Sequence, residues 1–103
     1  MLIIIHTTAK KKKELKKISK ILLGKKLVAC AQINRIESQF IWENKIEKEK
    51  EYAMSLKTDS KFFKKISKII RKFHSYETPE ILAVKIHRVS KKYKKWLEDS
   101  IKI

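Results

Sequence analysis

The sequence contains only one glycine, one proline and one cysteine among its 103 residues. A single glycine cannot build the glycine-rich loop that cradles a phosphate group, and neither a nucleophile elbow nor a metalloprotease helix motif occurs. The single cysteine, Cys30, excludes an internal disulfide and is typical of a reducing compartment. The sequence therefore predicts a cytoplasmic protein that is not an enzyme.

Long apolar runs are also missing from the chain. No stretch approaches the roughly 20 residues that a membrane-spanning helix needs. The opening run Leu2–Ile5 is too short for the apolar part of a signal peptide, and no basic segment precedes it. We therefore expect no membrane insertion and no secretion signal.

Acidic side chains are scarce, and arginine is scarcer. The 11 Asp and Glu residues face 27 Lys and Arg residues, which gives a formal net charge of +16, and only 3 of the 27 are arginine. Such a charge is typical of proteins that bind nucleic acid or anionic membrane surfaces. Base-reading proteins rely on arginine, however, whereas the 24 lysines and 16 isoleucines of this chain match the composition that an A+T-rich genome produces. We favour composition bias as the source of the charge and expect no nucleic-acid partner.

What remains is enough for one folded domain over residues 1–103. Hydrophobic residues make up 43% of the chain and charged residues 37%, and disordered chains carry fewer branched aliphatic side chains than this. The chain is long enough for a single hydrophobic core and too short for two.

The first third of the chain predicts a strand, a helix and a second strand. Leu2–Thr8 is a β-branched run, and Thr8 is placed to cap a helix over Ala9–Lys25. Apolar residues recur in this helix at spacings of three and four, so its lysines are expected to point outward, and Gly24 is expected to end it in a left-handed conformation. Leu27–Ile36 predicts the second strand, which continues toward Trp42.

The remainder predicts a hairpin, a second helix, a fourth strand and a terminal helix. Asn44, after Glu43, is expected to form the corner of the hairpin, and Lys45–Thr58 its returning strand. Asp59 or Ser60 can cap a helix that runs to about His74. Beyond a loop at Pro79, Ile81–His87 reads as a strand, and Ser90 opens a short helix.

This order of elements predicts an α+β fold of the ferredoxin-like type. It reads βαββαβ plus a C-terminal helix, which gives an antiparallel sheet with two helices on one face and a long hairpin between the second and third strands. One sheet face and the far end of the hairpin then lack cover within the chain. We expect a neighbouring subunit to cover them, in a ring closed by heterologous contacts.

The segment His74–Ile81 is the first candidate for a functional site. It places His, Tyr and Glu side chains, all able to bind a metal or move a proton, beside the only proline. His74 is a candidate metal ligand, and its alternative role is a hydrogen bond to a backbone carbonyl. Cys30, between two alanines, is a weaker metal candidate that also fits as a small buried hydrophobe. A thiolate pair of these two residues lacks an orienting third group.

Several motifs together resemble the CutA divalent-cation tolerance family over nearly the whole chain. The residues that carry the resemblance are Leu27–Ala31, Phe40, Trp42, Glu43–Glu47, Glu51, Leu56–Thr58, His74–Ile81, Tyr93, Trp96 and Leu97. The resemblance implies a stable homotrimer of ferredoxin-like subunits whose hairpins wrap their neighbours. It also implies a role in tolerance of copper and other divalent cations, with no established enzymatic reaction.

The resemblance also bears on the metal ligands. In some family members the proposed pocket uses a thiol at the end of the first strand and two adjacent histidines in the loop, and this chain has His6, Phe73 and His74 at those positions. His6 can ligate Cu(II) in place of a thiol, whereas Phe73 ligates nothing. The family's usual proline after the loop histidine is Ser75 here, and its usual glycine at the hairpin tip is Asn44. Cu(II) or another divalent cation is the expected cofactor.

Further residues are expected at a pocket or interface between subunits. Trp42 is a candidate anchor because tryptophan supplies much buried area where chains meet. Glu77 or Glu80 is expected to pair with Lys57 or with a lysine of another subunit. Glu47, Glu49 and Glu51 form either a solvated acidic stripe or part of the same crevice, and the remaining candidates are Tyr76 and Trp96.

Two other classes share the predicted order of elements. An RNA-recognition module would display stacking aromatics on its central strands, but the third strand here reads Lys50, Glu51, Tyr52, Ala53. A trimeric sensor of nucleotides or small anions, of the PII type, would need a long loop between the second and third strands, and the turn at Asn44 is short. Both stay as alternatives.

Overall fold

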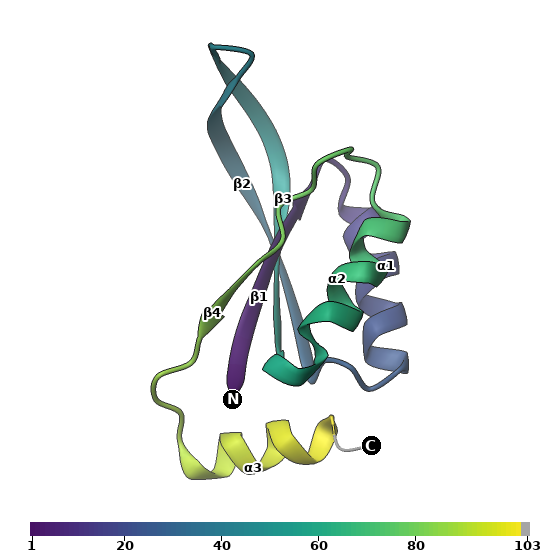
Figure 1. Ribbon diagram of the computed structural model, residues 1–103, viewed down its shortest axis with the longest axis vertical. Coiled ribbons are helices and arrows are strands. Elements are labelled where there is room, and N and C mark those ends of the chain that lie inside the picture. Colours follow the sequence, from purple (N-terminus) through teal and green to yellow (C-terminus); the bar gives the residue numbers. More distant parts are fainter. Residues whose placement is uncertain (102–103) are drawn as a thin grey trace.

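The computed structural model describes residues 1–101 and contains the predicted elements in the predicted order (Figure 1). They are β1 (Leu2–Ala9), α1 (Lys12–Gly24), β2 (Cys30–Trp42), β3 (Lys45–Asp59), a 3-10 turn (Ser60–Phe62), α2 (Phe63–Phe73), β4 (Leu82–Lys85) and α3 (Lys91–Ser100). The strands form one antiparallel sheet in the order β2-β3-β1-β4. This confirms the α+β fold with a long hairpin and a C-terminal helix.

The core lies between one face of the sheet and the helices α1 and α2 (Figure 1). Ile5 pairs with Leu56, and Thr7 with Met54, and all four side chains are fully buried on the helix-covered face. The helices contribute fully buried side chains of their own, namely Leu15, Ile18, Leu22, Ile66 and Ile70. The lysines of both helices are exposed, as their spacing predicted.

The ends of α1 differ from the prediction. Thr8 does not cap it, because Thr8 pairs with Ala53 and the strand continues to Ala9; the N-cap is Lys11, without a side-chain bond. Gly24 is the last helical residue, and Lys26 takes the left-handed conformation with φ of 56°. The N–H of Lys26 donates to Leu23 O and that of Leu27 to Leu22 O, which is a Schellman ending with lysine in the usual glycine position.

Other boundaries also shift. The second strand begins at Cys30 and not at Leu27. Leu27 is buried just before the strand, and its carbonyl accepts a hydrogen bond from the Thr58 hydroxyl at 2.6 Å. Asp59 accepts the N–H of Lys61 at 2.9 Å and so caps the 3-10 turn rather than α2 itself. The fourth strand is shorter than Ile81–His87, because only Leu82–Lys85 pairs with β1.

The hairpin of β2 and β3 extends well beyond the rest of the sheet (Figure 1). Its tip is Glu43 and Asn44, both with positive φ, which confirms the predicted corner. Residues 45–51 of β3 pair with β2 alone, since β1 reaches only to Tyr52. Four apolar side chains near the tip are exposed: Phe40, Ile41, Trp42 and Ile46. The tip therefore displays apolar surface that this single chain does not cover.

Candidate functional site

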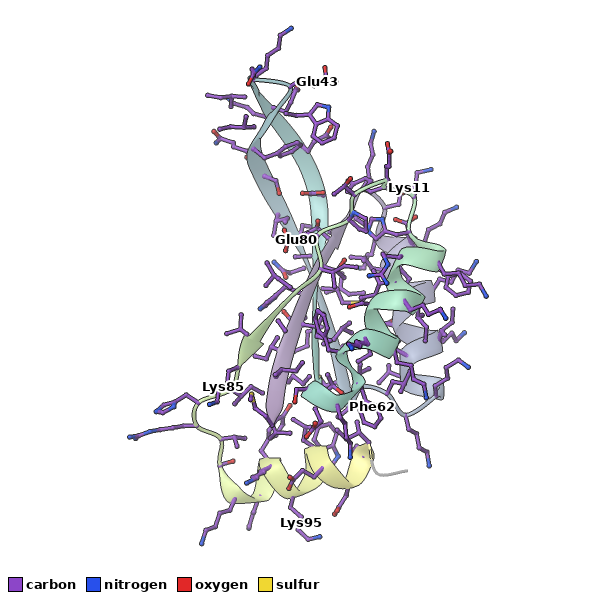
Figure 2. All side chains as sticks on the ribbon, viewed as in Figure 1. Lys11, Glu43, Phe62, Glu80, Lys85 and Lys95 are labelled. Atoms are coloured by element: carbon purple, nitrogen blue, oxygen red, sulfur yellow. The ribbon has the colours of Figure 1, made fainter. Side chains whose placement is uncertain are left out.

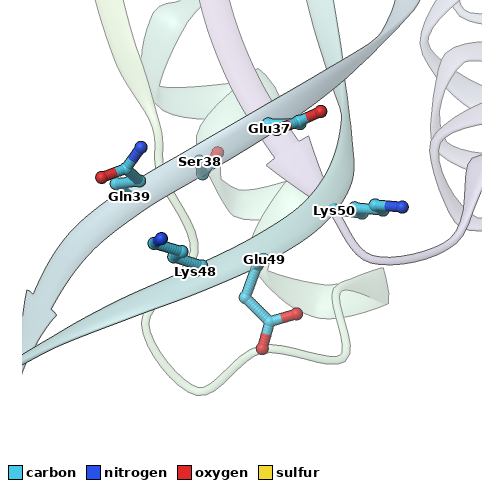
Figure 3. A pocket seen from close by; sticks show the side chains of 6 residues that line it. All are labelled: Glu37, Ser38, Gln39, Lys48, Glu49 and Lys50. Carbon is cyan, nitrogen blue, oxygen red and sulfur yellow. The ribbon is translucent and has the colours of Figure 1, made fainter.

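A groove of about 1010 Å³ lies where the hairpin meets the loop that follows α2. The hairpin forms one wall with Glu37–Phe40, Trp42, Glu47, Glu49 and Glu51, and the loop forms the other with Ser75–Thr78 and Glu80. Thr8 and Lys10 also line it. A smaller hollow of about 300 Å³ lies on the hairpin itself, lined by Glu37–Gln39 and Lys48–Lys50 (Figure 3).

The groove is acidic in a strongly basic protein. Six of the chain's 11 acidic residues line it, against one lysine, Lys10. The acidic stripe of β3 therefore lines the same groove as the loop glutamates Glu77 and Glu80, while Glu47 and Glu49 remain exposed to solvent and only Glu51 is buried. In Figure 3 the Glu49 side chain extends from its strand on the side of the loop. A groove with this charge attracts cations and repels anions.

His74 ties the loop to β1. Its side chain is fully buried, its Nε2 lies 2.6 Å from Thr8 O, and its Nδ1 lies 3.0 Å from the N–H of Tyr76. Because a carbonyl only accepts, Nε2 carries the proton and Nδ1 is the acceptor of the Tyr76 N–H, so the ring is a neutral imidazole. Glu14 Oε2, 3.8 Å from Nδ1, is too distant for a hydrogen bond. The bond to a backbone carbonyl is the alternative role that the sequence had allowed.

Two glutamates hold the loop on either side of His74. Glu14 of α1 accepts the N–H of Ser75 at 2.9 Å and its hydroxyl at 3.2 Å. On the opposite side, the Tyr76 hydroxyl donates to Glu51 Oε2 of β3 at 2.9 Å. Burial, the hydrogen bond to Glu51 and the charges of nearby glutamates raise the pKa of Tyr76 to about 12. Ser75 thus gains two bonds at the position where a proline would offer neither.

Four of the predicted pocket residues meet in this groove, and two do not. Trp42, Tyr76, Glu77 and Glu80 line it. Lys57 lies elsewhere, beside α3, where its Nζ donates to the Tyr93 hydroxyl at 3.3 Å and sits 5.4 Å from the ring centroid. Trp96 is the neighbour of Tyr93, with ring centroids 5.4 Å apart. Within this chain Lys57 therefore pairs with an aromatic residue and not with Glu77 or Glu80.

The candidate metal ligands lie apart in the single chain. His6 pairs with Ser55 and Cys30 with Lys57, so both occupy the sheet face away from α1 and α2. They stand on strands either side of β3 and are offset by two residues along it, hence roughly 12 Å apart at a strand spacing of about 4.8 Å and a rise of about 3.3 Å per residue. Both nitrogens of His74 are already engaged. Among residues 1–101 no three His, Cys, Asp or Glu side chains converge on one point, so a single chain does not fit a divalent cation.

Two groove and loop residues, Glu14 and Glu37, were not predicted from the sequence. Glu14 fixes the loop and Glu37 lines the groove. For Glu14 a signal existed, because it is the only acidic residue in the lysine-rich segment 10–20. Glu37 pairs with Lys50 across the hairpin, so its side chain projects from the opposite strand face to Glu47, Glu49 and Glu51, and only the folded structure shows that it lines the groove.

No helix in the described part of the chain is long and apolar enough to cross a membrane. Comparison with known proteins adds a consistent set of relatives. Residues 3–100 match the family model described as CutA1 divalent ion tolerance protein. A divalent-cation tolerance protein CutA from Archaeoglobus fulgidus is 41% identical over 97 residues, covering 94% of this chain and 95% of that protein. Another CutA, from Pyrococcus horikoshii, is 33% identical and covers 98% and 99%.

Solved structures agree with these sequence matches. The structure described as the periplasmic divalent cation tolerance protein CutA from Archaeoglobus fulgidus superimposes with a TM-score of 0.95, at 40% identity, over 99% of this chain and 100% of that one.

A plant relative from Arabidopsis thaliana, named protein CutA, chloroplastic, is 30% identical over 95% of this chain and 54% of its own length. These names specify two compartments, neither of them the cytoplasm, and indicate no catalytic activity.

Proposed function

Because the chain belongs to the CutA1 divalent ion tolerance protein family, we propose that it acts in divalent-cation tolerance. In this proposal it is a homotrimer that binds the cation and catalyses no reaction, and Cu(II) is the first candidate ion. Residues 1–103 would act as one domain. A cytoplasmic location stays a prediction, because the names of two relatives give other compartments.

The acidic groove beside an uncovered apolar hairpin tip carries the proposal. Ile41 and Ile46 are 77% and 74% exposed at the tip, and burying side chains of this size contributes about 1.5–3 kcal/mol each. A neighbouring subunit is the simplest cover for them and for the free edges of β2 and β4. Such a contact would also place donor atoms of a second chain beside the groove, where one chain alone does not complete a cation site.

Particular residues would supply the donors. His6 lies on the uncovered face and its Nδ1 is 3.3 Å from the Ser55 hydroxyl, which leaves Nε2 available to an ion. Cys30 on the same face offers a thiol. The glutamates of the groove offer oxygen ligands, which suit hard cations, whereas imidazole and thiol suit copper. His74 would contribute as a ligand only by giving up a bond that holds the loop.

The alternatives have less support. The uncovered face of the central strands presents Ile4, His6, Ser55 and Lys57, without the stacking aromatics of an RNA-recognition sheet. A PII-type sensor of anions would not suit a groove with six glutamates, and the turn at Glu43 and Asn44 is too short for its long loop.

Light scattering combined with copper titration tests the proposal. The 12.3 kDa chain is expected at three times its mass, with assembly weakened at low salt because the subunits repel one another. His6→Ala is expected to lower copper affinity, while His87→Ala, an exposed histidine away from the groove, should not. His74→Ala is a poorer probe because it also releases the loop. A single-chain mass at all salt concentrations, or equal copper affinity in both variants, would contradict the proposal.

A further inference from the structure

The positive charge of the protein is concentrated on one layer of the structure. Residues 10–26 and 59–74, which contain α1 and α2 with their flanking turns, hold 15 of the 27 basic residues and only 2 of the 11 acidic ones. These two segments therefore account for +13 of the net charge of +16. Residues 27–58, which include the equally exposed hairpin, hold five basic and five acidic residues. Composition bias alone would raise the lysine content of both surfaces.

We refer to the 14 lysines and Arg71 of residues 10–26 and 59–74 as the helical basic face. All of them are exposed, and Figure 2 shows nitrogen-tipped side chains projecting from α1 and α2 away from the sheet. None forms an ion pair within the described residues. The two acidic residues are occupied elsewhere, Glu14 with Ser75 and Asp59 with the N-terminal ammonium.

The charges of the two helices form one continuous surface. Lys17 of α1 and Lys72 of α2 both approach Phe73, with Nζ atoms 5.2 Å and 5.5 Å from its ring centroid. Ammonium groups from two different helices thus approach the same ring, and neither forms an ion pair within the described residues. A surface that carries this many like charges destabilises the isolated protein through self-repulsion and favours a partner that brings many anionic groups.

We infer that the helical basic face binds duplex nucleic acid through its phosphates, independently of base sequence. The 13 residues of α1 span about 20 Å at roughly 1.5 Å per residue. A duplex presents about 12 phosphate charges over that length, one for each ~1.7 Å. Lysine with a single arginine suits phosphate contacts, which position a protein on the duplex without reading bases. The composition had led us to expect no nucleic-acid partner. We depart from that expectation because the positive charge is concentrated in the two helical segments and is balanced in residues 27–58.

Other anionic partners fit this face less well. Leu23 is the one large apolar side chain exposed in the two segments, so the face offers no row of apolar side chains to insert into a bilayer. Its aromatic rings are buried (Phe62) or half-buried against the core (Phe63 and Phe73), so they offer no open platform on which single-stranded bases could stack. Of the helical basic face only Lys10 also lines the acidic groove, so the inference does not depend on cation binding.

Fluorescence anisotropy with a labelled duplex of about 20 base pairs, as DNA and as RNA, tests the inference across a series of salt concentrations. Five or so phosphate contacts predict a slope of about −4.5 for log affinity against log salt. The triple reversal Lys16→Glu, Lys20→Glu and Lys68→Glu should lower affinity by about 10²-fold or more at 0.1 M salt, since each contact contributes roughly 0.9 log unit. Circular dichroism checks folding, and the triple Lys→Gln change at the same positions should give an intermediate loss.

The matched control is the triple Lys91→Glu, Lys92→Glu and Lys94→Glu on α3, which changes the net charge equally. It should lower affinity by less than about threefold through the long-range field alone. Equal losses in the two triples would overturn the inference, because net charge rather than this face would then govern binding. It would also be overturned by a wild-type protein that binds neither duplex, or that prefers vesicles of phosphatidylcholine and phosphatidylserine (7:3) at the same salt.

Discussion

The helix-covered part of the sheet and the hairpin tip use similar side chains in opposite environments. Ile5 and Leu56 pair across β1 and β3 beneath the two helices, and both are 0% exposed. Ile41 and Ile46 pair across β2 and β3 near the tip and are 77% and 74% exposed. The strand β3 runs through both regions, so the difference arises from what covers the strand rather than from the strand itself.

This difference separates what one chain can do from what needs a second. The covered region buries its apolar side chains within the chain and can account for folding of the monomer. The isoleucines at the tip contribute no hydrophobic stabilisation until another surface buries them. Between the two regions lies the loop after α2, which is tied to β1 by His74 and to the base of the hairpin by Tyr76.

The strongest test of the comparison is to remove apolar volume from each region in turn. Leu56→Ala in the covered region is expected to lower the free energy of unfolding by about 2–5 kcal/mol, because the cavity cannot be refilled. Ile46→Ala at the tip should change it by less than about 0.5 kcal/mol in the single chain. Urea denaturation measures both, at concentrations where light scattering finds single chains. A loss for Ile46→Ala that matches Leu56→Ala would remove the distinction.

Releasing the loop from β1 is expected to have the next largest effect. His74→Ala leaves the Thr8 carbonyl and the Tyr76 N–H without their partners, which should cost about 2–4 kcal/mol in unfolding free energy. His87→Ala, on an exposed histidine, is the matched control and should be close to neutral. Faster amide exchange at Tyr76 would identify the loop as the affected part. Unchanged exchange in His74→Ala would show that Glu14 and Glu51 hold the loop alone.

Releasing the loop from the hairpin should cost less and should depend on pH. Tyr76→Phe removes the donor to Glu51, which is 9% exposed, at an expected cost of about 1–2 kcal/mol. The pKa of Tyr76 rises from 10.0 to about 12 on folding, so its contribution is complete below pH 10 and is lost as the pH rises toward 12. Wild type should therefore lose stability in this window more steeply than Tyr76→Phe. Tyr52→Phe is the control, and identical pH curves for wild type and Tyr76→Phe would contradict the assignment.

The sequence predicted the covered region better than the groove, for a physical reason. Apolar side chains at spacings of three and four mark a helix face directly, and the buried Leu15, Ile18 and Leu22 were readable from spacing alone. Helix ends depend on weaker local preferences, and at the end of α1 a lysine took the left-handed position expected of glycine. Strand pairing overrode the capping preference of Thr8 in the same way.

The groove depends on contacts between residues far apart in sequence. Tyr76 meets Glu51, and Ser75 meets Glu14, through packing of a loop that no local pattern fixes. The sequence could name Tyr76, Glu77, Glu80 and Trp42 from the composition of two segments, and the structure brings these four together. The sequence wrongly grouped Lys57 with these four residues, because the partner of Lys57 is Tyr93 and depends on the position of α3 in the fold.

The smallest expected effect concerns Asp59, at the end of β3 farthest from the tip. Burial raises the pKa of Asp59, but the N–H of Lys61 and the N-terminal ammonium outweigh it and hold that pKa below 3.8. Its contribution is therefore present above pH 3.8 and is lost as the pH falls through the lower folded value. Asp59→Ala should cost about 0.5–1 kcal/mol at neutral pH, and the difference from wild type should shrink in acid. Because this end belongs to the covered region, urea denaturation should show the same loss in single chains and in any assembly, whereas a loss that varied with protein concentration would place Asp59 at an interface.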